Sequence, residues 1–268
     1  MNVKSILDLT KLTRGRIECR QVYRDFIALA AMKISIAIDV VHRQSRIAAQ
    51  AELLQKYSQA EREQLMTGIG ELCLHFADSL SNDHYDDLLG RVYQELGMTG
   101  KNGVEFSPYD ICSVIAQISM ADVMKELPAK GYFTMNDCCC GSGNLLLAAA
   151  EEITKKGFNV CQHLVMQAND ISLNCVYMTY VQLSLHGIPA VVIHGDTITL
   201  KEYDRWYTPA YILGRWVWRC PMPFSSGRNR SDELLKMAEE PMYAAIRQTQ
   251  WFLAQKQGSE DNDIKKEA

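Results

Sequence analysis

The hydrophobic positions of the first hundred residues recur at steps of three and four. In residues 61–80 the apolar side chains at this spacing are Leu65, Ile69, Leu72, Phe76 and Leu80. Residues 83–96 repeat the pattern, and residues 21–57 carry almost no turn-forming residues. Because an α-helix has about 3.6 residues per turn, this spacing places the apolar side chains on one helical face. The pattern predicts a helical N-terminal domain over residues 1–100.

A different rhythm begins at residue 132, where short apolar segments alternate with helix-forming segments. The predicted strands are residues 132–136, 164–168, 190–193 and 211–218, and the predicted helices are residues 145–154 and 174–186. Such alternation is typical of a parallel, doubly wound sheet. We therefore predict a Rossmann-like α/β domain over residues 101–256. Residues 257–268 are polar and are expected to form a disordered tail.

A helix start lies between these two regions. Residues 97–103 are rich in glycine, and Ser107 is followed by Pro108 and Asp110. A serine cap, a proline in the first turn and an acid near the positive helix end all favour a helix here. The simpler interpretation is a capped core helix. The alternative is that Phe106 and the exposed amides of this helix start border a ligand.

Composition excludes several classes of protein. The chain has 268 residues, of which 47% are hydrophobic, and its net charge of −4 provides no overall basic field to attract nucleic acid. The most apolar segment, residues 26–41, is interrupted by Lys33 and Asp39, which favours a buried amphipathic helix over a membrane span. The first eleven residues lack the apolar run of a signal peptide. We expect a cytoplasmic protein with reduced thiols.

The segment NDCCCGSGN, residues 136–144, places three adjacent cysteines before two glycines. Adjacent residues of an extended strand point to opposite faces, so Cys138, Cys139 and Cys140 are not expected to ligate one metal. Redox pairs are usually separated by two residues. The cysteines are therefore interpreted as small apolar fillers, and no metal site is predicted. Gly141 and Gly143, between a strand and a helix, would let the backbone approach a ligand.

An acidic residue follows each of the first three predicted strands. These residues are Asp137, Asp170 and Asp196. Taken singly, each is more simply a cap or turn acid. Because the carboxyl ends of parallel strands meet at one edge of a sheet, the three together favour a site for a nucleoside-type ligand.

These segments carry a resemblance to a known family. EFSP, residues 105–108, resembles the F-[YF]-T-P segment, and DCCCGSG resembles the D-P-A-C-G-S-G loop, of adenine-specific DNA methyltransferases. ANDIS and HGDTI are similar to the strand-end acid and the G-D-[ST] segment that follow in that family. Residues 103–197 thus resemble the S-adenosylmethionine-binding half of these enzymes, particularly the modification subunits of type I restriction systems.

The resemblance implies a site for S-adenosylmethionine. Phe106 would pack near the adenine, and the loop from Asp137 to Gly143 would hold the methionine end. Asp170 would bind the ribose hydroxyls, and Asp196 would lie by the adenine amino group. The implied cofactor-binding residues are Phe106, Ser107, Pro108, Asp137, Cys140, Gly141, Ser142, Gly143, Asn169, Asp170 and Asp196.

The catalytic segment departs from the family pattern. Its members carry N-P-P-[FYW], in which the Asn and a backbone carbonyl accept the hydrogens of the target amino group while the aromatic ring stacks on the flipped base. Here the sequence reads RCPMPF, with Pro221, Pro223 and Phe224 as the matching catalytic candidates. Met222 is inserted between the prolines and no Asn precedes them. Cys220 stands closest to the expected Asn, and cysteine is a poor acceptor. The remaining strands of a full methyltransferase sheet and a target-recognition domain have no counterpart in this sequence.

A basic cluster interleaved with tryptophans precedes this segment. Its members are Arg205, Arg215, Arg219, Arg228 and Arg230, with Trp206, Trp216 and Trp218 among them. The cluster could bind nucleic acid by stacking and charge. The commoner explanation is a strand with solvated flanks.

Two main functional hypotheses remain open, beside a third, a nucleotide-binding regulator of another kind. The first is an S-adenosylmethionine-dependent, site-specific DNA adenine-N6 methyltransferase of the type I modification-subunit kind, which binds DNA together with partner subunits. Such a partner would be a specificity subunit or a complementary methyltransferase subunit. The second is a catalytically inactive, cofactor-binding pseudo-methyltransferase that acts through protein partners.

Overall fold

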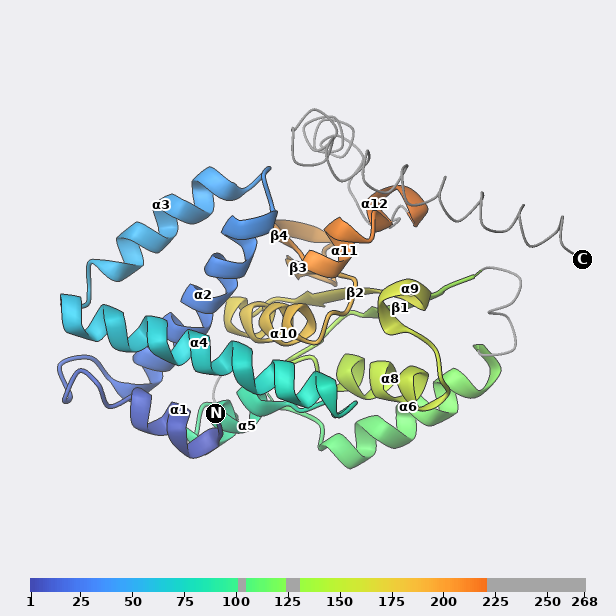
Figure 1. Ribbon diagram of the computed structural model, residues 1–268, viewed down its shortest axis with the longest axis horizontal. Coiled ribbons are helices and arrows are strands. Elements are labelled where there is room, and N and C mark those ends of the chain that lie inside the picture. The colour runs from blue at the N-terminus through green and yellow to red at the C-terminus, as the bar shows by residue number, and fades with distance from the viewer. Residues whose placement is uncertain (101–104, 124–130, 221–268) are drawn as a thin grey trace, which may run out of the picture. The chain divides into compact units, whose positions relative to one another are not determined.

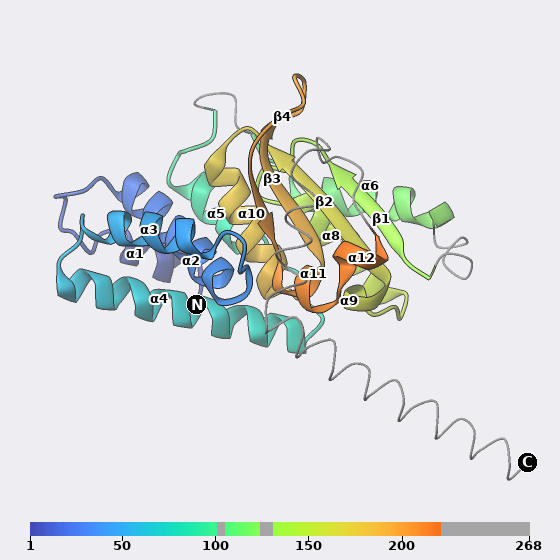
Figure 2. The same cartoon turned by 90° about the horizontal axis from the view of Figure 1, so that it is seen from above.

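The computed structural model describes residues 1–100, 105–123 and 131–220, and these residues belong to one compact unit. The N-terminal part is helical, as predicted (Figures 1 and 2). Its helices are α1 (Val3–Leu9), α2 (Cys19–Ile38), α3 (Arg43–Leu54), α4 (Gln59–Ser81) and α5 (Leu88–Glu95). None of the helices in the described part of the chain is both long enough and apolar enough to cross a bilayer.

A buried aspartate divides the long helical segment predicted over residues 21–57. Asp39 is fully buried, and its carboxylate accepts hydrogen bonds from the backbone amides of Val41, at 3.1 Å, and His42, at 3.2 Å. The same carboxylate lies 2.8 Å from Nδ1 of His42. An aspartate that bonds to the backbone in this way favours a turn over a continuous helix, so α2 ends before Asp39 and α3 begins after His42.

The α/β part contains a four-stranded sheet in the order β1-β2-β3-β4. Its strands are β1 (Phe133–Asp137), β2 (Leu164–Asp170), β3 (Ala190–Asp196) and β4 (Lys201–Tyr207). The first three are parallel, and β4 is antiparallel to β3. Helices α8 (Asn144–Lys155) and α10 (Leu173–Leu185) make the crossovers between the parallel strands and lie on one side of the sheet (Figures 1 and 2). The predicted α/β class is confirmed.

The predicted fourth strand is wrong. Most of residues 211–218 lie in two short helices, α11 (Pro209–Leu213) and α12 (Trp216–Arg219). The Thr208 side chain accepts from the Tyr211 amide at 3.4 Å, and Pro209 occupies the first turn, so this apolar segment begins with a helix start. The true fourth strand, KEYDRWY, lies upstream and carries four charged residues, which hid it from a search for apolar segments.

The helical part packs directly on the α/β part. Helix α10 lies between the sheet and the N-terminal helices, and α2 runs along it (Figure 1). The hydroxyl of Tyr23 on α2 donates to the sulfur of Met178 on α10 at 3.5 Å. On α3, the Arg46 guanidinium forms two hydrogen bonds with the Asp204 carboxylate on β4, at 2.6 and 2.8 Å, and lies 3.4 Å from the centre of the Trp206 ring. The described helices are thus fixed to the sheet at more than one point.

Helix α6 (Tyr109–Val123) begins where the Ser107–Pro108 pair predicted, with Asp110 in its first turn. One side packs against α8 and includes buried Cys112 and Ala116. The opposite side is apolar yet solvent-exposed and carries Ile111, Val114, Ile115 and Ile118.

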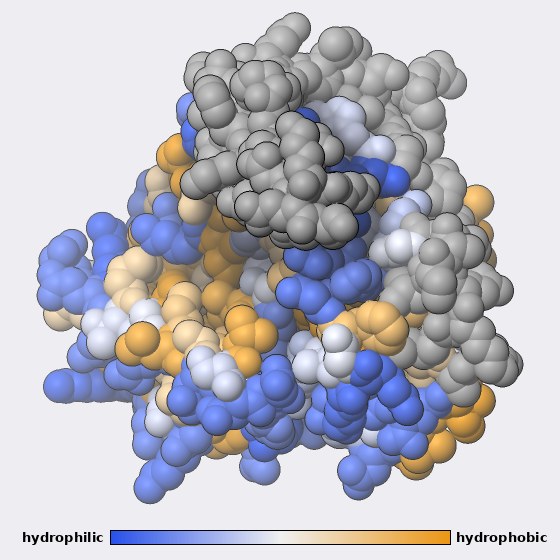
Figure 3. Space-filling model, turned by 45° about the vertical axis from the view of Figure 1, so that its right-hand side comes forward, coloured by the Kyte–Doolittle hydropathy of each residue, from blue (hydrophilic) through white to orange (hydrophobic). Residues whose placement is uncertain are grey.

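On the face drawn in Figure 3, the coloured residues are mainly hydrophilic, with apolar patches between them. The short helix α9 (Val160–His163) leads into β2.

Candidate functional site

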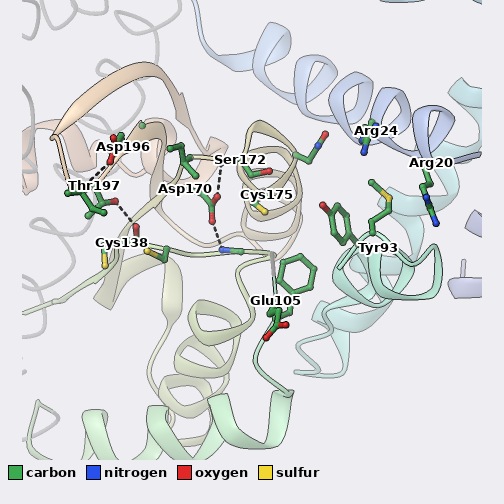
Figure 4. Close-up of a pocket in the computed structure, with 18 of the residues that line it drawn as sticks. Arg20, Arg24, Tyr93, Glu105, Cys138, Asp170, Ser172, Cys175, Asp196 and Thr197 are labelled. Atoms are coloured by element: carbon green, nitrogen blue, oxygen red, sulfur yellow. Dashed lines mark hydrogen bonds between the residues drawn. The ribbon is translucent and has the colours of Figure 1, made fainter. Parts of the chain in front are cut away.

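A cavity of about 660 Å³ lies at the carboxyl ends of the parallel strands (Figure 4). This is the edge at which open α/β sheets bind ligands, and small-molecule sites usually enclose about 300–1,000 Å³. Four of the residues predicted to bind a cofactor line it, namely Phe106, Gly141, Asp170 and Asp196. The sequence-based prediction of a site at this edge therefore coincides with a cavity of suitable size.

Asp170, the last residue of β2, lies in the middle of the cavity lining (Figure 4). One carboxylate oxygen accepts from the Gly141 amide at 2.9 Å, and the other accepts from the Ser172 amide at 2.8 Å. Burial raises the pKa of this carboxyl above its ordinary value. A carboxylate oxygen has two lone pairs, so each oxygen can accept a further hydrogen bond from a ligand. Asp170 therefore holds the glycine loop and presents acceptors to the cavity at once.

The loop from Asp137 to Gly143 turns sharply after β1. The Asp137 carboxylate accepts from the Cys139 amide at 3.1 Å, and the Cys140 amide donates to the carbonyl of Asn169 at 3.0 Å. Burial also raises the pKa of Asp137. Gly141 has a φ of +57°, and a Cβ atom there would lie 3.0 Å from the Phe106 ring. The loop thus brings its backbone against Phe106 at the cavity, which only glycine allows.

Seven of the predicted cofactor residues do not line the cavity. They are Ser107, Pro108, Asp137, Cys140, Ser142, Gly143 and Asn169. Gly143 has a φ of +92°, and a Cβ atom there would lie 3.1 Å from the Thr179 hydroxyl on α10. The sequence suggested that this glycine leaves space for a ligand, whereas the structure gives it a packing role against α10. The Ser107 carbonyl similarly accepts from the Asn144 side chain at 2.9 Å, which joins the starts of α6 and α8.

The three cysteines are divided by the turn. Cys138 and Cys139 are exposed and line the cavity, so the interpretation of these two as apolar fillers is wrong. Cys140 is buried 3.5 Å from the Thr179 hydroxyl, as the filler interpretation requires. The difference arises because β1 ends at Asp137, so strand alternation does not apply to the cysteines. All nine cysteines are free, and no cluster of three metal-ligating side chains occurs among the described residues.

A buried carboxylate that sequence reasoning missed supports the loop from beneath. Asp87, at the start of α5, accepts from the Ser142 hydroxyl at 2.8 Å, the Gln182 side chain at 2.9 Å and the Gly90 amide at 3.0 Å. Gln182 also donates to the Ser142 carbonyl at 2.7 Å. Burial raises the pKa of Asp87. The spacing from Asp87 to Gly90 is a readable helix cap, but nothing local in the sequence indicates Ser142 as a partner.

The cavity has two opposing sides (Figure 4). The sheet wall comprises the lining residues at the strand ends, from residues 138–141, 170–175 and 195–198. The helical wall comprises Arg20, Arg24, Tyr93, Gly97 and Met98. Sequence reasoning missed the helical wall completely, because its residues lie on or just after α2 and α5, many tens of positions before the glycine loop. Their approach depends on how α2 and α5 pack against α10.

The basic and aromatic cluster is mostly part of the protein interior. Trp206 and Trp216 are completely buried, so neither can stack on a base. Arg205 forms an ion pair with Glu202 at 2.6 Å. Of the three tryptophans in this cluster, only Trp218 is exposed, by 41%. Arg215 and Arg219 lie over the rings of Trp218 and Trp216, at 5.8 and 3.9 Å from the ring centres. Arg228 and Arg230 lie outside the described residues. The strand interpretation therefore holds for Arg205 and Trp206 on β4, whereas Trp216, Trp218 and Arg219 lie on the short helix α12.

The catalytic candidates Pro221, Pro223 and Phe224 also lie outside the described residues. Cys220, at the position expected for the catalytic Asn, is described and is buried. The pKa of the Tyr132 hydroxyl is raised, first by its interaction with the Cys220 thiol. The position that should present an amide acceptor thus holds a thiol in contact with a tyrosine.

Comparison with known proteins places this architecture in a family. A family model described as N-6 DNA Methylase matches residues 78–214, a little more than half of the chain. The chain belongs to the N-6 DNA methylase family. The matched range starts before Asp87 and ends after β4, so it includes the whole sheet wall and the network beneath the loop.

Two known proteins are similar to this chain over part of their length. The type I restriction enzyme MpnII methylase subunit of Mycoplasma pneumoniae is 27% identical over 125 residues, which cover 47% of this chain and 22% of that protein. The chain therefore spans about a fifth of the length of this curated relative. The crystal structure of a type I restriction-modification methyltransferase subunit from Streptococcus thermophilus aligns with 74% of this chain and 59% of its own, at 14% identity and a TM-score of 0.35.

Proposed function

We propose that this chain binds S-adenosylmethionine in the cavity and acts as a DNA adenine-N6 methyltransferase of the type I modification-subunit kind. Family membership and the name of the Mycoplasma relative support the class. The observation that carries the proposal is Asp170, a strand-end carboxylate that faces a cavity of about 660 Å³ beside a glycine loop. This is the arrangement with which doubly wound folds bind a ribose.

The residues of the cavity fit this cofactor. Asp170 can accept hydrogen bonds from both ribose hydroxyls, and charged acceptors make the stronger bonds. Two isoleucines also line the cavity: Ile171, which follows Asp170, and Ile198, which lies two residues after Asp196. They are 65% and 94% exposed. Exposed isoleucines at the rim of a cavity are suitable surfaces for the faces of a purine ring. When bound, the cofactor would supply an electrophilic methyl group on a sulfonium.

The loop residues would hold the cofactor and exclude water. Gly141 lets the backbone and the Phe106 ring close the floor of the cavity, and Asp170 fixes the Gly141 amide in place. Asp196 keeps its carboxylate at the rim by accepting from the amides of Ile198, at 2.9 Å, and Thr199, at 3.3 Å. By family resemblance this acid would lie by the adenine amino group. DNA would be bound together with partner subunits, such as a specificity subunit or a complementary methyltransferase subunit, in the cytoplasm.

A second candidate function is supported by Cys220. The target amino group is a poor nucleophile, since its lone pair is delocalised into the ring, and family members use an Asn oxygen to accept its hydrogens. Cys220 is buried and interacts with Tyr132, and a thiol is a weak acceptor. The alternative is therefore a pseudo-methyltransferase that binds the cofactor and acts through protein partners.

One pair of measurements separates these functions. Titration calorimetry with S-adenosylmethionine measures binding, and transfer of a tritiated methyl group to unmethylated DNA measures turnover, with Asp170→Ala as the negative control. Binding with transfer supports the methyltransferase, and binding without transfer supports the pseudo-methyltransferase. If the wild-type chain does not bind the cofactor, both functions are excluded.

A further inference from the structure

The helical wall carries two arginines that the proposed ribose and adenine contacts do not use. Arg20 and Arg24 lie four residues apart on α2, so they share one helical face, and both line the cavity. Nε of Arg24 is buried without a hydrogen-bond partner, and no carboxylate of the described residues pairs with this guanidinium. A guanidinium that lines a cavity without an ion-pair partner is suited to bind a ligand acceptor.

Arg20 is held in position beside it. Its Nε donates to the carbonyl of Leu96 at 2.8 Å, and its only acidic neighbour in the described part is Glu18, at 3.7 Å and largely exposed. A Cβ atom added to Gly97, the next residue, would lie 3.4 Å from Nη2 of Arg20. The backbone therefore approaches the guanidinium closely. Two like charges at one end of a partly enclosed cavity attract an anion.

The polar groups of the cavity follow an order (Figure 4). Asp196 and Thr197 lie toward one end, Asp170 lies in the middle, and Arg24 and Arg20 lie at the opposite end. The cofactor of the proposed function has a comparable order, with a base, a ribose and an amino-acid group that carries its single carboxylate. Glu105 also lines the cavity but forms no ion pair with either arginine.

We infer that Arg24, with Arg20 beside it, binds the carboxylate of the amino-acid end of S-adenosylmethionine. This inference rests on the proposed function and adds the helical wall to its site. A DNA phosphate is the other anion that the family would bring. The structure favours the carboxylate because Arg24 lines a partly enclosed cavity, which a small ligand reaches more readily than a duplex backbone.

The test is a thermodynamic cycle between protein and ligand. Calorimetry compares S-adenosylmethionine with its decarboxylated analogue, on the wild-type chain and on Arg24→Gln. The wild type should favour the carboxylate-bearing ligand by on the order of 10- to 100-fold, as hydrogen bonds to charged groups usually do. Arg24→Gln should remove that preference and bind the decarboxylated analogue as the wild type does. Arg24→Lys, which keeps the charge, should retain part of the preference.

Lys33→Gln is the matched control, since Lys33 is an exposed residue of the same helix outside the cavity. It should leave both affinities unchanged. An equal loss of affinity for both ligands in Arg24→Gln overturns the inference, although binding by the wild type would still support the proposed function. A loss of DNA affinity with unchanged cofactor affinity also overturns it and assigns the arginine to phosphate. Failure of the wild type to bind either ligand removes the proposed function together with the inference.

Discussion

The two walls of the cavity are built by different means. On the sheet wall, short loops after β1 and β2 are held by hydrogen bonds within one neighbourhood, as between Asp170 and Gly141 at 2.9 Å. On the helical wall, Arg24 and Tyr93 come from separate helices that reach the cavity only through packing on α10. The sheet wall is therefore a local structure that sequence patterns describe, whereas the helical wall exists only in the folded molecule.

The largest effect is expected from breaking the sheet wall at its centre. Asp170→Ala removes the ribose acceptor and leaves the Gly141 and Ser172 amides without it, so cofactor affinity should fall on the order of tenfold to a thousandfold. Asp170→Asn should lose less, because its amide keeps one acceptor. Calorimetry gives the affinities, and ligand-free thermal melts should show a stability loss of about 1–3 kcal/mol for the Ala variant. Unchanged affinity with a normal melt would reduce Asp170 to a turn acid.

Breaking the link between the N-terminal helices and the sheet should affect stability next most strongly. Arg46→Leu removes the bidentate pair with Asp204 and the contact over Trp206, and should lower the free energy of unfolding by about 2–3 kcal/mol, since one partner stays behind partly buried. Chemical denaturation followed by tryptophan fluorescence measures the change. Arg91→Leu, which breaks the more exposed pair with Asp86, serves as control and should cost less than about 1 kcal/mol. Equal effects in the two variants would argue against Arg46 as an anchor.

Gly143→Ala tests which glycine serves packing. Its φ of +92° and the Thr179 hydroxyl 3.1 Å from an added Cβ predict a stability loss of about 1–2 kcal/mol. Because Gly143 does not line the cavity, the folded variant should keep most of its cofactor affinity. Gly141→Ala, which would press on Phe106 inside the cavity, should instead reduce affinity. The prediction is wrong if Gly143→Ala melts normally but no longer binds.

The smallest effect is expected from pH near neutrality. Burial raises the pKa of Asp170 above its ordinary value of 3.8, and the ionised form accepts the ribose hydroxyls, so affinity should be constant at neutral pH and decline as pH falls through the raised pKa. In the ligand-free protein, the same raised pKa makes the free energy of unfolding change with pH in the opposite direction to the cofactor affinity. A raised pKa in the folded state contributes stability at low pH that is lost as pH rises through it. Calorimetry across acidic pH should show the decline in wild type and a flatter profile in Asp170→Asn.

Much of the sheet wall could be predicted because its signals are local. The order of strand, acid and glycine placed Asp170 and Gly141 correctly, and the boundaries of β2 and α10 differ from the prediction by a residue or two. The fourth strand was missed because its charged residues, such as Asp204 and Arg205, are paired with Arg46 and Glu202 in the fold. Pairing of this kind is invisible along the chain.

The helical wall could not be predicted for a related reason. Arg24 has the sequence context of a surface residue, and only the packing of α2 against α10 directs it into the cavity. Asp87 likewise presents a helix-cap signal that explains its bond to Gly90 but not its bonds to Ser142 and Gln182. Long-range contacts decide these roles, and a single sequence carries no direct record of them.

The Asp87 carboxylate also limits how the methyltransferase motifs can be transplanted. A designer who grafted residues 133–197 onto another scaffold would bring Ser142 and Gln182 but leave their shared acceptor behind. Two buried donors would then face an empty position beneath the glycine loop, and the loop would have to find a new shape. The shortest segment that could be grafted intact therefore starts upstream of Asp87. It must include α5, although α5 contains none of the recognisable family motifs.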